Sequence, residues 1–555
     1  MDDLRVFTAA KIHTMDQGRP HADAVAVADG RIVSVGSLKS MQPWLRRYDH
    51  TIDETYTDGV LMPGFIDPHT HLRMSGSYMA LNYVGPIDSA SPTGVRAGLP
   101  DRDTVLNQLR SLASETTIGD DGRPKPVTAW GYDPATQQGH LDRDMLDQIS
   151  DTVPLWVVAY APHIVYANTP MIDLIGVDEA TTLHGLGRYP DGRLNGWFVE
   201  TAATAAAFKP VAADVYRPGF GREAIDRMGA VAKEAGITTT ADMIWGLEDF
   251  EREWDQHRAA IDAGTFPLRL LMVPWQGALQ RSFGKDTFDF LAERTAASDD
   301  RLASHGVKFV NDGSYPSMTL RLGFPGYLDG EVGLTGQTPW EDVYETMLPY
   351  WKAGIQIHSH ANGDETVDMT LDVLEKLLVN HPRFDHRFVI EHYCLSSTSQ
   401  ARRLAALGGC ASVNAYFVKF RAQMHADMGF GPDRSEATAR LGSLERAGAA
   451  FALHSDFNLV VTPLSPLLVA EIAVTRIGAD GETVLAPGER ISVDRALRAI
   501  TIDAAHVLRR DDQLGSIEVG KLADFTVLAD DPYQVAPTDL GSIEVVDTIL
   551  GGIPT

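Results

Sequence analysis

Two histidines two residues apart, His69 and His71, are the side chains in this sequence best suited to chemistry. They lie in the segment GFIDPHTHL at 64–72, directly after the apolar run from Val60 to Ile66. That run predicts a β-strand, and residues i and i+2 of a strand point to the same face. Two imidazoles at one strand end suit a divalent metal that takes several nitrogen ligands. A single His-x-His motif is weak evidence, so the prediction depends on further ligands elsewhere.

Seven more apolar segments follow the first, and helical patterns separate most of them. They cover residues 236–242, 267–274, 306–312, 355–361, 387–394, 410–416 and 450–457. Eight parallel, nearly continuously apolar strands that alternate with helices predict an α/β fold, a (β/α)8 TIM barrel. In such barrels the reactive groups lie at the C-terminal strand ends. Those ends carry four histidines, a lysine and an aspartate: His69, His71, Lys308, His360, His392 and Asp456.

Several of these positions leave alternatives open. His358 lies two residues before His360 and on the same strand face; we prefer His360 as the ligand and keep His358 as a deeper group. Glu391 and His392 are neighbours, so strand alternation predicts that only one of them enters the barrel. Lys308 is either a buried ion-pair partner or, after reaction with carbon dioxide, a carbamate that bridges two cations as a carboxylate does.

Both ends of the chain predict β structure. Residues 23–36 form two alternating runs joined by Asp29-Gly30, which is a strong hairpin signal. Residues 515–530 and 545–552 are similar short strands separated by turn residues. A β-sandwich domain assembled from both termini is therefore expected.

The strand spacing gives the domain boundaries. We predict that residues 1–60 and 511–555 form the β-sandwich and that residues 61–510 form the barrel domain. The spacing is regular except after the first barrel strand. This break predicts a large insertion at about 75–218, which forms a subdomain or lid over the barrel mouth.

Composition narrows the classes of partner. The chain has 555 residues and a formal net charge of -27, which disfavours binding to nucleic acid and to anionic lipid. The two cysteines, Cys394 and Cys410, provide neither a disulfide framework nor a Cys-type zinc site. The N-terminus lacks the pattern of a signal peptide, and no apolar run approaches the roughly 18 residues of a membrane span. We therefore expect a cytoplasmic protein with a small-molecule substrate.

Taken together, these motifs resemble the amidohydrolase superfamily of metal-dependent hydrolases. The matching segments are GFIDPHTHL (64–72), VKFVNDGS (307–314), HANGD (360–364), IEH (390–392), HSDF (454–457) and LGSIEVGKLADFTVL (514–528). With the N-terminal hairpin they span nearly the whole chain in the family's order. The VK-x-x-x-DGS segment, HANGD and the long insertion look most like the YtcJ-like branch, which includes N-substituted formamide deformylases.

The resemblance implies a ligand set and a mechanism. The six strand-end residues match the family's metal ligands, Lys308 can be carboxylated, and a zinc-type metal, singly or as a pair, activates water. Such a metal lowers the pKa of bound water towards roughly 7 and polarises a carbonyl. Asp456 is expected to move a proton from that water to the leaving nitrogen. His163 resembles a histidine that the branch carries in its insertion, where it binds substrate or the oxyanion.

Two departures from the family pattern affect the pocket. Asn362 in HANGD stands where the branch more often has an aliphatic residue. His454 in HSDF stands where members often have Gly-Ser-Asp, so it either enters the site or simply packs. Other substrate-binding candidates come from loops at the same strand ends: Arg73, Tyr315 and Arg321.

The predicted function is hydrolysis of a C–N bond, most naturally in a non-peptide amide. The same scaffold can instead cleave a lactone or ester, deaminate a ring or decarboxylate, because a fold does not settle function. A non-catalytic binding protein is the alternative from another class, but such a protein need not keep both Lys308 and Asp456. A homodimer is expected from the family resemblance alone.

Overall fold

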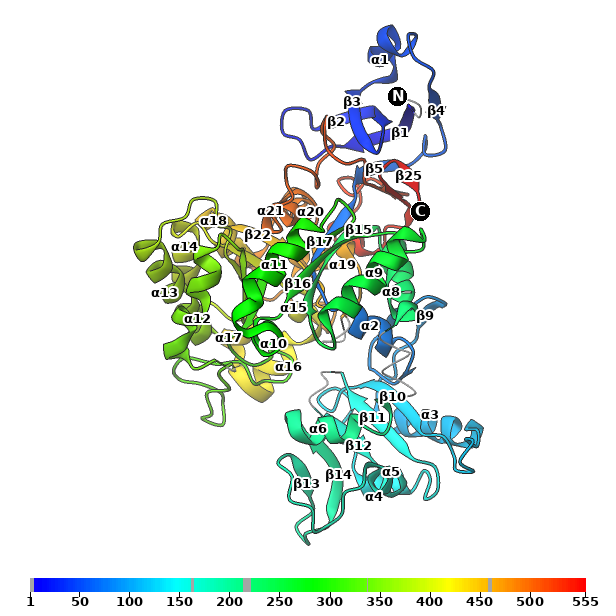
Figure 1. Cartoon of the computed structure of the whole chain (residues 1–555), viewed down its shortest axis with the longest axis vertical. Coiled ribbons are helices and arrows are strands. Elements are labelled where there is room, and N and C mark those ends of the chain that lie inside the picture. Colours follow the sequence, from blue (N-terminus) through cyan, green and yellow to red (C-terminus); the bar gives the residue numbers. More distant parts are fainter. Residues whose placement is uncertain (1–3, 161–163, 213–220, 337, 458–461) are drawn as a thin grey trace. The chain divides into compact units, whose positions relative to one another are not determined.

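The computed structural model describes residues 4–160, 164–212, 221–336, 338–457 and 462–555. The chain divides into two compact units. The first unit comprises Met1–Thr70, Ala232–Ser455 and Ser465–Thr555, and the second comprises His71–Val231 and Asp456–Leu464. Figure 1 shows the ribbon coloured along the sequence.

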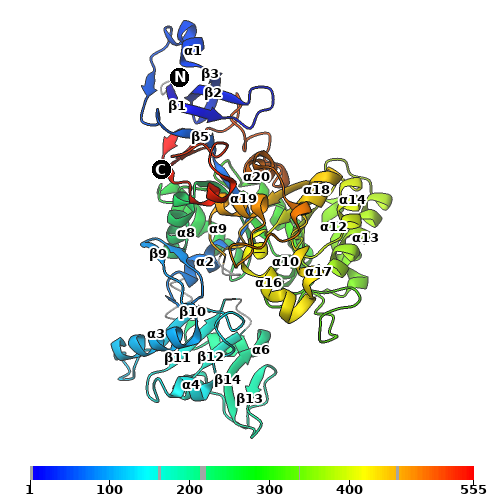
Figure 2. The ribbon, with the colours of Figure 1, turned by 180° about the vertical axis from the view of Figure 1, so that it is seen from behind.

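Strands from both ends of the chain form one eight-stranded sheet in the first unit. Its order is β25-β24-β23-β5-β1-β2-β3, with β4 paired to β1. The strands are β1 (Arg5–His13), β2 (His21–Ala28), β3 (Arg31–Gly36), β4 (Thr51–Asp53), β5 (Val60–Pro63), β23 (Phe525–Leu528), β24 (Val545–Leu550) and β25 (Ile553–Pro554). Helix α1 (Leu38–Leu45) follows β3, with a capping box between Ser37 and Ser40. The β structure expected from the two ends of the chain is therefore confirmed, and Figure 2 shows the blue N-terminal strands next to the red C-terminal segment.

Local chemistry explains two features of this sheet. The predicted hairpin turn falls between β2 and β3, where Asp29 and Gly30 have φ of 51° and 73°. Two adjacent residues with positive φ match the tight turn that Asp-Gly favours. β23 pairs with β5 in antiparallel fashion, which attaches the C-terminal strands to the N-terminal ones. Buried side chains from both ends, including Phe7, Ile517 and Phe525, form one core.

Parallel strands make up the rest of the first unit. One sheet has the order β6-β15-β16-β17 and another has the order β18-β19-β20-β21-β22. The strands are β6 (Phe65–Thr70), β15 (Ile237–Trp245), β16 (Arg269–Pro274), β17 (Leu302–Ser304), β18 (Val307–Val310), β19 (Ile357–Ala361), β20 (Val389–His392), β21 (Cys410–Val413) and β22 (Ala450–Leu453). A parallel bridge from Trp275 to Lys308 links the two sheets, and β22 lies against β6. This is the strand order expected of a ring of parallel strands, and the α/β fold is confirmed.

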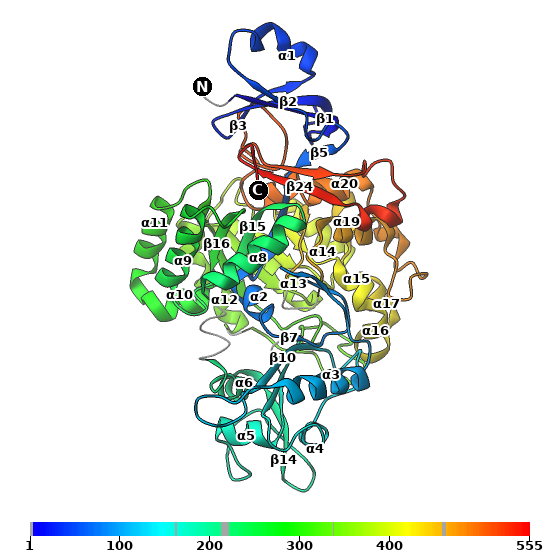
Figure 3. The same ribbon diagram turned by 90° about the vertical axis from the view of Figure 1, so that its right-hand side faces the viewer.

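Helices connect the parallel strands (Figure 3). They are α9 (Phe250–Asp262), α10 (Gln276–Phe283), α11 (Thr287–Ala296), α12 (Trp340–Lys352), α13 (Asp364–Asn380), α14 (Thr398–Ala406), α15 (Tyr416–Phe420), α16 (Ala422–His425), α17 (Pro432–Glu436), α18 (Leu441–Ala447), α19 (Pro466–Thr475), α20 (Val493–Ala499) and α21 (Ile502–Val507); α8 (Arg222–Glu234) precedes β15. A buried apolar core joins strands β6, β15 and β16 to α21, with Ile66, Val273 and Val507 among its members. In the part of the chain that the structure describes, no helix is both long and apolar enough to cross a membrane.

The second unit has its own six-stranded sheet in the order β13-β14-β12-β11-β10-β7, and a separate pair, β8-β9. The strands are β7 (Asn82–Tyr83), β8 (Ser89–Ser91), β9 (Gly94–Arg96), β10 (Val127–Tyr132), β11 (Leu155–Ala159), β12 (Ile164–Ala167), β13 (Leu186–Arg188) and β14 (Leu194–Val199). The helices are α2 (Leu72–Tyr78), α3 (Arg102–Glu115), α4 (Arg143–Asp147), α5 (Thr169–Ile175) and α6 (Glu200–Phe208). A buried core lies between the sheet and α3, with Val105 and Leu109 packing on Val127.

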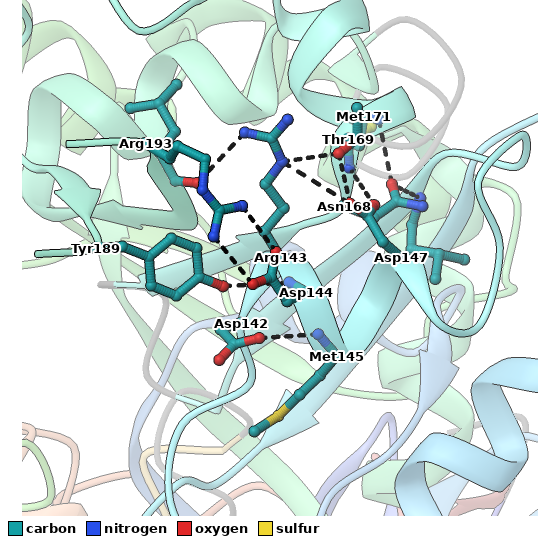
Figure 4. A network of polar contacts seen from close by, with 12 residues as sticks. Asp142, Arg143, Asp144, Met145, Asp147, Asn168, Thr169, Met171, Tyr189 and Arg193 are labelled. Atoms are coloured by element: carbon teal, nitrogen blue, oxygen red, sulfur yellow. Dashed lines mark hydrogen bonds and ion pairs between the residues drawn. The ribbon is translucent and has the colours of Figure 1, made fainter. Parts of the chain in front are cut away.

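Polar contacts fasten α4 to its neighbours in this unit (Figure 4). Arg143 Nε donates to Thr169 Oγ1 at 2.7 Å, and Arg193 pairs with Asp144 at 3.2 Å. The Tyr189 hydroxyl accepts the backbone N–H of Asp144 at 3.2 Å. The side chains of Arg193 and Asp144 are about half exposed, so solvent screens their ion pair and it contributes little to stability. The network orders the surface of the unit and shows no sign of a reactive centre.

Candidate metal centre

The ends of the parallel strands bring a group of histidines together in the first unit. His69 is the next-to-last residue of β6, Lys308 lies on β18, His360 on β19 and His392 at the end of β20. The ring of His392 has its centroid 4.6 Å from the ring of His69 and 4.6 Å from the ring of His360. His69 is fully buried, and Lys308 and His392 are each only 4% exposed. Four predicted ligands from four separate strands are thus close to one another.

A buried carboxylate, Glu391, organises these histidines. Its Oε2 atom lies 2.6 Å from Nδ1 of His69, and its Oε1 atom lies 2.7 Å from Nδ1 of His358. Burial by itself raises the pKa of Glu391, but the hydrogen bond from His358 and the charges of Lys308 and His358 outweigh it and lower the pKa to about 2. The ionised carboxylate can only accept, so each histidine donates an Nδ1–H to it, and in neutral His69 this leaves the lone pair on Nε2.

The expectation that only one of Glu391 and His392 enters the barrel is wrong. Strand alternation fails at this point because His392 and Tyr393 have φ of 72° and 47°. In that left-handed conformation the backbone turns at His392, and both neighbouring side chains reach the histidine cluster. Sequence reasoning therefore missed Glu391, although its position beside a predicted ligand was a signal.

Lys308 is adjacent to a predicted ligand. Its Nζ atom lies 3.3 Å from Nε2 of His69, the nitrogen that carries the lone pair. Lys308 pairs with His358 across β18 and β19, which explains how the strand register holds it at this depth. The position agrees with either role considered for the lysine, and carboxylation of Lys308 stays a prediction.

His454, the departure from the family's glycine, lies in the cluster. It directly follows β22, and its ring stacks on that of His69 with centroids 4.6 Å apart. Its Nε2 atom is 3.3 Å from Nδ1 of His392, and its Nδ1 atom is 2.7 Å from the hydroxyl of Ser412. Of the two roles left open by the sequence, entry into the site is the one that the structure supports.

The second departure, Asn362, links three loops at the strand ends. Its side-chain amide donates to the carbonyl of Gly313 at 2.8 Å and lies 2.8 Å from Nε2 of His360. Its side-chain oxygen accepts from the thiol of Cys394 at 3.0 Å. The carboxylate of Asp312 accepts the backbone N–H of Asn362 at 3.0 Å. An aliphatic residue cannot make the side-chain bonds, so Asn362 fixes the turn that follows His360.

A second carboxylate connects the first and last motifs. Asp67 accepts from the hydroxyl of Ser455 at 2.5 Å and from its backbone N–H at 3.3 Å. Both residues are buried and belong to the first unit. Asp67 in GFIDPHTHL and Ser455 in HSDF therefore hold the ends of β6 and β22 in a fixed relation.

The remaining two predicted ligands belong to the second unit. Its boundary falls between Thr70 and His71 and between Ser455 and Asp456. Within this unit His71 Nε2 lies 3.1 Å from Oδ1 of Asp456, and both residues are buried. Asp456 has φ of 55°, in the left-handed region that aspartate adopts more readily than most other non-glycine residues.

The predicted substrate-binding residues have different surroundings. Tyr315 is fully buried, its hydroxyl lies 2.8 Å from that of Thr438, and its ring stacks on Phe417. Arg321 donates to Glu365 at 2.6 Å. Arg73, in the second unit, is 4% exposed. His163 lies outside the described residues. Tyr315 and Arg321 thus have structural partners, while their role towards substrate stays a prediction.

The side chains of the cluster fit a divalent cation. His69, His392 and His454 each offer a nitrogen, and these atoms all lie within 4.8 Å of one another. Burial lowers the pKa of His392 well below its ordinary value of 6.5, and the neighbouring histidines and Lys308 lower it further. A histidine that stays neutral keeps a lone pair for a metal, and imidazole suits zinc and similar ions.

A buried histidine cluster at the ends of parallel strands in an α/β fold is a candidate metal site of the kind that such folds carry at this edge. A family model described as "Amidohydrolase family" matches residues 57–555. The chain therefore belongs to the amidohydrolase family, as its motifs predicted.

Its relatives extend over nearly the whole chain. It is 28% identical to the protein LONG AFTER FAR-RED 3 of Arabidopsis thaliana, over 99% of this chain and 91% of that one. It is 24% identical to the N-substituted formamide deformylase of Arthrobacter pascens, over 100% of this chain and 98% of that one. It is 21% identical to the putative amidohydrolase YtcJ of Bacillus subtilis (strain 168), over 98% of this chain and 97% of that one. The predicted branch is confirmed by these similarities.

A solved structure agrees with the fold. The structure of an uncharacterized metal-dependent hydrolase from Pyrococcus horikoshii OT3 has a TM-score of 0.73 at 19% identity, covering 96% of this chain and 99% of that one. At this level of identity the similarity shows a common fold.

Proposed function

We propose that this protein is a metal-dependent amidohydrolase that cleaves a C–N bond of the amide type in a small non-peptide substrate. The observation that carries the proposal is the buried cluster of His69, His392 and Lys308 around the carboxylate of Glu391. A structural role alone explains such a cluster poorly, because burying several polar groups is costly unless they serve a purpose. The family membership and the similarity to a formamide deformylase support the reaction class.

The proposed ligand set is His69, His71, Lys308, His360, His392 and Asp456. Four of them belong to strands of the first unit: His69, His360 and His392 lie in the last two residues of their strands, and Lys308 lies within β18. The sequence supports the other two, because His71 follows His69 by two residues and Asp456 follows His454 by two residues. The set suits one or two zinc-type cations, and a carbamate on Lys308 would add oxygen ligands to it. When bound, such a cation supplies an acidified water near neutral pH and polarises the scissile carbonyl.

The chain's own residues complete the proposed chemistry. Asp456 accepts a proton from water at its carboxylate and returns it to the leaving nitrogen, and the contact with His71 orients that carboxylate. Glu391 keeps the lone pair of His69 on Nε2. We assign His163, Arg73, Tyr315 and Arg321 to substrate recognition. A net charge of -27 favours a small-molecule substrate over nucleic acid. We also propose a homodimer, which light scattering tests.

The first test is metal content by elemental analysis on protein purified without added metal or chelator. Close to two equivalents of zinc, manganese or iron supports the pair bridged by a carboxylated Lys308 and directs screening towards N-substituted formamides and other small amides. About one equivalent of metal per chain would still support a hydrolase but would exclude a bridging role for Lys308. No metal, together with no amide hydrolysis after metal is added, would overturn the proposal.

A further inference from the structure

We propose that His454 is itself a metal ligand, and that His69, His392 and His454 form a three-imidazole site for one cation. The inference rests on the proposed function, since it requires the protein to use a metal. It goes beyond the six ligands above, because members of the family often have glycine where His454 stands. This cation would be held by side chains of the first unit alone.

The spacing of the nitrogens carries the proposal. His454 Nε2 and His392 Nδ1 are 3.3 Å apart. Two nitrogens that each lie about 2.0–2.1 Å from a tetrahedral zinc are separated by about 3.3–3.4 Å. The third nitrogen, from His69, lies within 4.8 Å of both. The three rings therefore need only a small adjustment to share one ion.

The hydrogen bonds around the cluster favour the tautomers that a metal requires. The Glu391 carboxylate accepts Nδ1–H of His69, which leaves the lone pair on Nε2. Ser412 Oγ lies 2.7 Å from Nδ1 of His454 and can accept a proton from it, which directs the lone pair of His454 to Nε2. Such outer partners of ligating histidines fix the ring orientation and the tautomer.

The backbone holds His454 where a ligand is needed. Its N–H donates to the carbonyl of Val413 at 3.1 Å, and the next residue, Ser455, is fastened to Asp67 near the end of β6. His454 is 1% exposed. A ring held this firmly pays little further entropy on binding an ion.

The site predicts a preference among metals. Three imidazoles suit zinc and cobalt, whereas magnesium and calcium prefer oxygen ligands. Lys308, which lies 3.3 Å from His69 Nε2, is then a neighbour of this cation that is not required to hold it.

The test compares the full-length wild type with His454→Gly, which introduces the residue common in the family; circular dichroism and the thermal midpoint of each protein establish that the variant is folded. Dissociation constants for Co²⁺ and Zn²⁺ are measured by chelator competition, and the visible absorption of the Co²⁺ form reports its ligands. Loss of an outer partner costs about 10–100-fold in metal affinity, so loss of a ligand is expected to cost more than about 100-fold. Free imidazole should then restore both the Co²⁺ spectrum and the affinity of His454→Gly.

Two matched variants separate a ligand from a structural residue. Ser412→Ala keeps the ring of His454 and removes its hydrogen-bond partner, so its loss should stay within about 10–100-fold. His257→Gln removes another fully buried histidine, on α9, and should leave metal affinity unchanged. An unchanged Co²⁺ spectrum and affinity in His454→Gly would overturn this inference alone. If the wild type binds neither Co²⁺ nor Zn²⁺, this inference falls, and the proposed function falls as well if added metal also gives no amide hydrolysis.

Discussion

Glu391 and His69 are joined by a 2.6 Å hydrogen bond between two side chains that are both fully buried. The same carboxylate also accepts from His358 at 2.7 Å. Because its pKa is lowered to about 2, Glu391 is ionised at neutral pH and sets the tautomers of both rings. It is therefore the residue on which the orientation of the histidine cluster depends, although it is not among the predicted ligands.

Glu391→Gln should weaken metal binding by about 10–100-fold. An amide has one acceptor oxygen and one NH2 group, so it can keep only one of the two histidines in its present tautomer. Metal titration of the apo-protein measures the effect. Glu489→Gln is the control, because Glu489 is a buried carboxylate that bonds to Ser443 away from the cluster. Equal metal affinity in the two variants would remove the orienting role of Glu391.

Lys308→Ala should lower metal content if a carbamate on Lys308 bridges two cations. A short carboxylic acid such as acetate should then restore part of the metal and of the activity, because it supplies the missing bridging oxygens. Lys521→Ala removes another buried lysine, one that donates to Ser516 in the terminal sheet, and should leave metal content unaltered. Full metal occupancy in Lys308→Ala would count against a bridge.

Asp456→Asn should retain most of the metal and lose about 10²–10⁴-fold in kcat, the usual contribution of general acid–base catalysis. The asparagine keeps the size of the side chain and a contact to His71 but cannot take up the proton. Metal analysis and steady-state kinetics on the same sample separate the two effects. Near-normal turnover would exclude Asp456 as the proton carrier.

The terminal sheet should lose stability in mild acid through His13. This side chain is buried beside Asp531, with 2.8 Å between Nε2 and Oδ1. Burial is the main cause that lowers the pKa of His13 below 6.5. The unfolded chain therefore binds this proton more readily than the folded chain does. The contribution of neutral His13 to the free energy of unfolding is complete above about pH 6.5 and declines as the pH falls below that value. Urea midpoints between about pH 7.5 and about pH 5.5 should change less in His13→Gln than in the wild type. Parallel curves for the two proteins would contradict the assignment.

Asp524→Asn should destabilise the first unit by about 3–5 kcal/mol without changing metal content. Asp524 accepts from Arg269 at 2.6 Å and 2.9 Å, and this buried pair joins β16 to the terminal sheet. The variant leaves the Arg269 guanidinium buried with a weaker partner. Chemical denaturation measures the loss, and the double variant Arg269→Met/Asp524→Leu should recover much of it. Stability equal to that of the wild type would show that the pair contributes nothing.

The sequence by itself determined the features that depend on local chemistry. Asp29-Gly30 specified a tight hairpin because few other pairs adopt positive φ at two successive positions. The apolar runs specified the parallel strands, since strands covered on both faces need no alternation. Motif order placed His69, Lys308, His360 and His392 at strand ends, and the family match over residues 57–555 agrees with it.

Only the tertiary structure decided which side chains meet. Strand alternation predicted that only one of Glu391 and His392 points into the barrel. The backbone leaves the extended conformation at His392, where φ is 72°, and both side chains contact the histidine cluster. The contacts of His454 with His392 and of Asn362 with Cys394 join residues 62 and 32 positions apart. Such pairs form only when strands that are distant in sequence come to lie side by side, and no local pattern of apolar and polar residues specifies which strands do so.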